Sequence, residues 1–201
     1  MHTKKLLGSV GLVALLMTVI VSVVAVPVEA ATYTYNRQAA VNYALQWWNK
    51  ANPAYRNFGS NDCTNFVSQC LYAGGWPMKG WNKWSLSHWF YYFGYYYSNT
   101  WTVADDFSKF LVYSGRGQAR SLAYKPWNQY FKIGDLVQID YNRDGKWDHT
   151  MIITKVTANE IYVTYHWASN SSVPLTSLMA NVMAKYPNAR FIGYQLYDQF
   201  T

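Results

Sequence analysis

Residues 62–70, which read DCTNFVSQC, set a cysteine at the predicted first turn of a helix, directly after an acid that can cap it. There Cys63 would lie against unpaired backbone N–H groups and the positive end of the helix dipole. Both favour the thiolate, which is the reactive form of cysteine. Downstream, His149 and His166 lie on predicted strands and could supply a general base and a residue that orients it. This combination is typical of a cysteine hydrolase.

Local sequence patterns predict the elements that would position these side chains. His149 opens one predicted strand and His166 closes the next, so antiparallel pairing would bring both imidazoles to the same end of a sheet. Helices come first and the strands follow, which predicts an α+β domain. The predicted helices are Arg37–Lys50 capped by Asn36, Cys63–Ala73 capped by Asp62, and Thr102–Tyr113 opened by a Thr102/Asp105 capping box. The predicted strands are Leu136–Asp140, His149–Val156, Ile161–His166 and Arg190–Tyr197, with a helical turn near Leu175–Lys185.

The cysteine segment resembles the motif of the putative amidase domain family, within the NlpC-like, papain-fold superfamily of bacterial cell-wall cysteine hydrolases. The resemblance runs from Tyr35-Asn36-Arg37 through Asp148-His149-Thr150 to Tyr165-His166. It implies a papain-like fold in which the helix that bears the nucleophile packs on an antiparallel β-sheet.

The resemblance also implies roles for single residues. Cys63 would be the nucleophile, His149 the general base, and His166 the residue that orients His149, with Asn170 as the alternative for that third role. The polar neighbours of the cysteine, Asp62 and Asn65, are candidates for contacts with the substrate or the oxyanion.

The implied function is a secreted, cysteine-dependent amidase or peptidase that hydrolyses amide bonds in cell-wall peptide (peptidoglycan). Two alternatives come from other classes: a non-catalytic wall-binding module that uses a basic, aromatic surface, and an acyl transferase that passes the thioester to an amine. An aromatic tract at residues 76–101 holds five tryptophans and five tyrosines. These are too many to be buried together in one domain, so we expect some to line the cleft.

Residues 1–30 are expected to be a signal peptide, because a basic start and a long apolar run precede a small-x-small site that ends at Ala30. An uncleaved membrane anchor is the alternative. Residues 31–201 would then form a single domain, with 15 basic and 9 acidic residues and a net charge of +6. Such a protein would be attracted to an anionic wall after export. We expect a monomer that is not inserted in the membrane. We expect no binding of nucleic acid, because the basic residues are scattered along the sequence.

No cofactor is expected to be required. Cys63 and Cys70 lie seven apart on one predicted helix, roughly 10 Å between Cα atoms, which is too far for a disulfide. Zinc is not expected, since closely spaced ligand pairs are absent from the sequence. Residues 140–145 match the start of a calcium loop, with Asp140, Asn142 and Asp144 as ligands, but a hairpin turn is the favoured interpretation.

Overall fold

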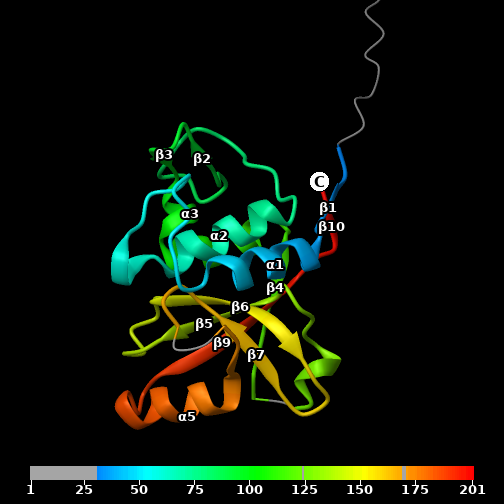
Figure 1. Cartoon of the computed structure of the whole chain (residues 1–201), viewed down its shortest axis with the longest axis vertical. Coiled ribbons are helices and arrows are strands. Elements are labelled where there is room, and N and C mark those ends of the chain that lie inside the picture. Colours follow the sequence, from blue (N-terminus) through cyan, green and yellow to red (C-terminus); the bar gives the residue numbers. More distant parts are fainter. Residues whose placement is uncertain (1–30, 124, 169–170) are drawn as a thin grey trace, which may run out of the picture. The chain divides into compact units, whose positions relative to one another are not determined.

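A six-stranded antiparallel sheet with helices on both faces positions the candidate residues (Figure 1). The computed structural model describes residues 31–123, 125–168 and 171–201, so the predicted signal peptide and Asn170 lie outside the described residues. The helices are α1 (Arg37–Trp47), α2 (Cys63–Ala73), α3 (Asn99–Thr102), α4 (Ala104–Tyr113) and α5 (Leu175–Lys185). The main sheet holds β4 (Gly117–Arg120), β5 (Leu136–Asp140), β6 (His149–Val156), β7 (Ile161–Thr164), β8 (Val173–Pro174) and β9 (Arg190–Leu196).

The strand order is β4-β9-β5-β6-β7-β8, and every neighbouring pair is antiparallel. Two small pairs stand apart from this sheet: β1 (Tyr33–Thr34) with β10 (Gln199–Phe200), and the hairpin of β2 (Tyr91–Tyr92) and β3 (Tyr96–Tyr97). Two 3-10 turns, η1 (Gly59–Asn61) and η2 (Trp127–Gln129), complete the elements. The antiparallel sheet with five helices agrees with the predicted mixture of α and β structure.

Side chains alternate across the central strands and build one core on each face of the sheet. Leu136 and Ile152 pack with residues of α1, α2 and α4 on one face. Val137, Ile139 and Met151 pack with α5 on the other. Figure 1 shows the same arrangement, with α1 and α2 on one side of the strands and α5 on the opposite side.

Helix α2 packs against both α1 and β6, and this packing fixes the position of its first residue. Asn36 caps α1 as predicted, since its side-chain oxygen accepts from the N–H of Ala39 at 3.0 Å. Gly74 directly follows the last residue of α2, and a Cβ on it would lie 2.6 Å from the ring of Tyr35, which comes just before α1. A residue without a Cβ is therefore needed where the two helices approach.

Several predicted boundaries match, and others differ. Strands Leu136–Asp140 and His149–Val156 are confirmed, and so is a helix that begins at Cys63. The capping box at Thr102 is wrong: Thr102 ends the short helix α3, and α4 begins at Ala104. The helical segment predicted near Leu175–Lys185 is confirmed with these bounds, as a helix of 11 residues.

The aromatic tract divides between the core and the surface. Trp76, Trp89 and Trp101 are fully buried, and Trp101 packs at 4.4 Å from Trp89 between ring centroids. Trp81 and Trp84 are exposed instead. Among the described residues, no helix is both long and apolar enough to span a membrane.

Candidate active site

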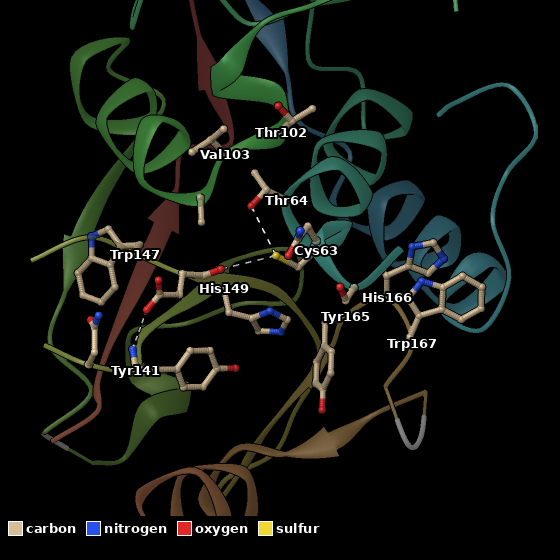
Figure 2. A pocket seen from close by; sticks show the side chains of 15 residues that line it. Cys63, Thr64, Thr102, Val103, Tyr141, Trp147, His149, Tyr165, His166 and Trp167 are labelled. Atoms are coloured by element: carbon tan, nitrogen blue, oxygen red, sulfur yellow. Dashed lines mark hydrogen bonds between the residues drawn. The ribbon is translucent and has the colours of Figure 1, made fainter. Parts of the chain in front are cut away.

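A pocket of about 830 Å³ opens at the start of α2, where β6 begins and β7 has ended (Figure 2). It brings together Cys63, His149 and His166, as the predicted strand pairing requires. Its aromatic walls are Tyr141, Trp147, Tyr165 and Trp167, and the rest of the lining is Ser60, Asn61, Thr64, Thr102, Val103, Ala104, Asn142 and Asp148. No aromatic residue of the tract at 76–101 is among them, so the expectation that the tract lines the cleft is wrong.

Cys63 and His149 are in direct interaction. Figure 2 shows the imidazole of His149 just beneath the Cys63 sulfur, where its charge and side chain lower the pKa of the thiol. Cys63 is 8% exposed, so the thiol is buried but still reaches the pocket wall. A nucleophile and a base within hydrogen-bonding reach are what thiol-based acyl transfer requires.

Opposing effects set the acidity of the thiol. Burial raises the pKa of Cys63, because an apolar environment disfavours the thiolate. The charge of His149 and hydrogen bonds from His149, the N–H of Thr150 and the hydroxyl of Thr64 stabilise the thiolate. These effects outweigh burial and lower the pKa from 9.0 to about 7. A large fraction of the thiol is therefore ionised near neutral pH.

A buried chain of polar groups continues from the sulfur into the core. The hydroxyl of Thr64 lies 3.8 Å from the Cys63 sulfur and 2.9 Å from the hydroxyl of Thr150. Gln138 then donates to that Thr150 hydroxyl at 2.9 Å and to the carbonyl of Ala104, also at 2.9 Å. Because these groups are bonded to one another, the position of Thr64 beside Cys63 is fixed.

The carboxylate of Asp62 does not cap α2, which corrects the predicted cap. It accepts from the N–H of Phe58 at 2.8 Å, from the side-chain amide of Asn65 at 3.0 Å, and from His166. Among the described residues, no acceptor is found for the N–H groups of Cys63 and Thr64. Unpaired N–H groups at a helix start can hold a developing oxyanion, so the missing cap has a chemical use.

His166 lies in the pocket wall but does not bond to His149, which corrects its predicted role. Its Nδ1 contacts Asp62, and its Nε2 lies 3.2 Å from the carbonyl oxygen of Lys50. Its ring is sandwiched between Phe66 and Trp167, at centroid distances of 5.0 and 4.5 Å. In Figure 2 the ring points away from His149 and lies against Trp167. His166 therefore fixes Asp62 rather than the general base.

The side chain of Asn65 faces the core, which corrects its predicted contact with the substrate. It is fully buried, donates to the carbonyl of Arg56 at 2.9 Å and to Asp62, and accepts from the indole N–H of Trp101 at 2.9 Å. Neither Asn65 nor Asp62 lines the pocket. Both stabilise the loop that leads into α2.

The surroundings of His149 are aromatic. Tyr165 meets its imidazole edge-on at a centroid distance of 4.9 Å, and Tyr141 lies at 6.4 Å. Burial raises the pKa of Tyr141 to about 12, so this phenol stays neutral at ordinary pH. Within the part of the chain that the structure describes, no third side chain hydrogen-bonds the His149 ring. Ring packing is what holds the imidazole in place.

The turn at residues 140–145 is stabilised by protein groups. Asp140 accepts from the side chain of Arg190 at 2.7 Å and from the backbone N–H groups of Arg143 and Gly145. Asn142 and Asp144 hydrogen-bond each other at 3.3 Å. The guanidinium of Arg190 thus places a positive charge beside Asp140, which would be the first ligand of a calcium loop.

Comparison with known proteins places the chain in a family. A family described as "Putative amidase domain" matches residues 34–193, which include the whole site. The chain belongs to the putative amidase domain family. Its match covers Cys63, His149 and His166 together. No solved structure matches the chain.

Two relatives of this amidase family member come from Bacillus subtilis (strain 168). The uncharacterized protein YhbB is 41% identical over 121 residues, which are 60% of this chain and 37% of YhbB. The uncharacterized protein YjcM is 31% identical over 148 residues, which are 70% of this chain and 32% of YjcM. The chain thus matches about a third of the length of each relative.

Sequence reasoning missed residues that contact the Cys63 sulfur. Thr64 and Thr150 both contact the Cys63 sulfur, and each directly follows a predicted site residue. That adjacency is a signal that could have found them. Trp167 carries the same signal, because it directly follows His166, whereas Trp147 follows no predicted site residue and is brought to the pocket by the folded loop.

Proposed function

We propose that this protein is a cysteine amidase or peptidase that hydrolyses amide bonds of cell-wall peptide, with Cys63 as nucleophile and His149 as general base. The observation that carries the proposal is the position of the His149 imidazole beside the Cys63 sulfur at an open pocket, where it helps to lower the pKa of the thiol to about 7. Membership of the putative amidase domain family supports the same class of chemistry.

The steps follow from the geometry. His149 takes the proton of the Cys63 thiol, and the thiolate attacks the carbonyl carbon of the amide. The oxyanion is held by the free N–H groups at the start of α2. His149 returns the proton to the nitrogen as the C–N bond breaks, which releases an amine and leaves a thioester on Cys63. His149 then deprotonates a water that attacks the thioester, so that a carboxylic acid leaves and the thiol is restored.

The pocket and the charge of the chain support the choice of substrate. Its walls combine aromatic faces with mostly neutral polar groups and one acidic residue, Asp148, which suits a peptide rather than a strongly charged small molecule. Residues 31–201 carry a net charge of +6, which attracts an anionic wall. We propose that residues 1–30 direct export, that cleavage follows Ala30, and that the protein acts as a monomer without a cofactor. We also propose a papain-like arrangement of helix and sheet of the NlpC-like type.

The test is mass spectrometry of muropeptides after digestion of purified cell walls. We expect the wild-type protein to release fragments that gain one water per bond cut, and Cys63→Ala to release none. Cys70→Ala is the matched control, because Cys70 lies on the same helix but is fully buried in the core, away from the pocket. Both cysteines are free thiols, as predicted, so neither change breaks a disulfide.

Fragments released equally by Cys63→Ala would contradict the proposal. So would products that carry an added amine in place of water, because these would indicate transfer of the acyl group rather than hydrolysis.

A further inference from the structure

A cluster of exposed and half-buried rings lies outside the pocket, on and beside the β2–β3 hairpin. We call it the aromatic platform; its members are Trp81, Tyr92, Phe93, Tyr95 and Tyr96. The ring of Trp81 lies 4.5 Å from Tyr92, 6.1 Å from Phe93 and 6.4 Å from Tyr96, between centroids. Trp81, Phe93 and Tyr95 are 59%, 72% and 74% exposed. A contiguous exposed aromatic surface is typical of a binding site.

The platform is anchored rather than loose. Tyr92 and Tyr96 are paired across the hairpin, and the hydroxyl of Tyr96 donates to the carbonyl of Trp81 at 2.5 Å. Beneath them the fully buried Phe90 stacks on Tyr92 at 4.9 Å and packs on Tyr96 at 5.2 Å. A surface that is already ordered loses little conformational entropy when it binds.

Phe93 is held in a backbone conformation that phenylalanine rarely adopts. Its φ is +57°, and it is followed by Gly94 at +77° at the hairpin tip. Asn or Gly is the usual residue in this region, because a Cβ costs about 1–2 kcal/mol there. Phe93 gains little burial in return. An apolar ring that is both strained and exposed points to a role in binding.

The positive charge near the platform favours an anionic partner. Residues 63–104 contain no Asp or Glu, whereas Lys79 and Lys83 lie within them. The ammonium of Lys83 sits 4.9 Å over the ring of Trp84, which is itself 71% exposed. Between residues 91 and 97 there is no Leu, Ile, Val or Met, and tyrosines dominate. Hydroxyl-bearing rings suit a partner that is polar at its edges better than the interior of a lipid layer.

We infer that the aromatic platform binds a polysaccharide that carries anionic groups, with sugar rings stacked on Trp81 and Phe93. The C–H faces of pyranose rings pack on aromatic faces, while their hydroxyls and anionic groups meet phenols and lysines. This inference rests on the proposed function and deepens it, because such a polymer is the glycan part of a cell wall. The hairpin leads directly into Thr102 and Val103, which line the pocket. A glycan on the platform would therefore tether the substrate beside the active site.

Sedimentation with purified cell walls tests the inference, with every variant made in the Cys63→Ala background so that the walls stay intact. Trp81→Ala and Phe93→Asn should each weaken binding about tenfold. Phe93→Asn should also raise the melting temperature, because Asn tolerates the left-handed backbone, so its loss of binding cannot come from misfolding. Tyr113→Ala is the matched control, since Tyr113 is 71% exposed on α4, away from the platform. It should bind like the parent.

Undiminished binding by both platform variants would overturn the inference. So would variants that keep wall binding and instead lose co-sedimentation with phosphatidylglycerol vesicles, because this would identify a membrane as the partner. Hydrolysis of short soluble muropeptides by the wild-type protein is measured separately, with Cys63 intact. Failure of the wild type in that assay would reject the proposed chemistry, whereas the binding results judge the platform separately.

Discussion

At the scale of single residues, burial and hydrogen bonding act on the Cys63 thiol in opposite directions. Burial alone would leave an inert cysteine, as at Cys70, whose pKa is raised well above its ordinary value. Cys63 differs because His149, Thr150 and Thr64 all stabilise its thiolate. Two cysteines on one helix thus have opposite chemistry, and the difference lies in what β6 brings to the first of them.

This contrast predicts a pH profile for alkylation. The rate of reaction of Cys63 with iodoacetamide should rise with pH through a midpoint near 7, because the thiolate is the reactive form. In His149→Ala the charge and the hydrogen bond of the imidazole are lost, so burial dominates and the midpoint should move upward. At pH 7 the variant should react more than about tenfold more slowly.

Mass spectrometry of the alkylated protein at each pH provides the measurement. Cys70 serves as an internal control, because it should stay unmodified in the folded protein. A midpoint for Cys63 near 9 that does not respond to His149→Ala would contradict this account of the thiol.

At the scale of elements, the start of α2 is organised by a buried acid and a buried imidazole. Asp62 is 1% exposed and His166 is 7% exposed, and each is the partner of the other. Asp62 also accepts from Phe58 and Asn65, so the pair joins the loop before α2 to the segment after β7. These contacts set where Cys63 begins its helix.

Asp62→Ala should therefore destabilise the fold by about 3–5 kcal/mol, because it leaves several buried donors without an acceptor. Urea unfolding measures the change. The matched control is Asp144→Ala at an exposed turn, which should cost less than about 1 kcal/mol. A loss no larger than that of the control would remove the proposed role of the pair.

His166 variants separate positioning of the helix from orientation of the base. His166→Gln should lower stability and activity while leaving the pH midpoint of the Cys63 alkylation rate near 7, because His166 does not bond to His149. A midpoint shifted as far as in His149→Ala would instead restore the role in which His166 orients the base.

At the scale of the folded unit, an arginine links the first helix to the sheet and to the end of the chain. Arg37 of α1 pairs with Asp135 at 2.7 Å and with Asp198 at 2.5 Å, and donates to the carbonyl of Leu196. Asp135 is 1% exposed, and burial raises its pKa in spite of the positive charge of Arg37. The segments that Arg37 joins lie far apart in sequence.

Arg37→Ala should cost about 3–5 kcal/mol at neutral pH, because the buried Asp135 loses its countercharge. Without Arg37 the folded-state pKa of Asp135 should rise further above the unfolded value. In Arg37→Ala, the protonated form of Asp135 stabilises the fold at low pH, and this contribution is lost as pH rises and the carboxyl ionises. The loss of stability relative to the wild type should therefore be smaller below about pH 4. Urea unfolding from pH 3 to pH 7 tests this.

Lys109→Ala is the control for that experiment. It removes an exposed i,i+4 pair with Asp105 and should change stability by less than about 0.5 kcal/mol at any pH. An Arg37→Ala deficit that does not vary with pH would show that Asp135 is not the group responsible.

The sequence by itself determined the parts of this protein that depend on local order. Residues 62–70 identified the helix that begins at Cys63, and the strand signals that follow Gly134-Asp135 identified β5 and β6 with their ends. Periodicity and the types of neighbouring residues are local properties, so they can be recognised in the sequence without knowledge of the fold. Placing His149 and His166 in one pocket needed only antiparallel pairing of two adjacent strands.

The tertiary structure decided which polar groups face one another. The sequence predicts that Asp62 caps α2 and that His166 orients His149. In the fold, Asp62 and His166 bind each other instead. The aromatic tract divides between the core and an exposed platform, while other aromatic residues reach the pocket. Such choices depend on side-chain direction and burial, which come from contacts between segments about a hundred residues apart and leave no trace in local patterns.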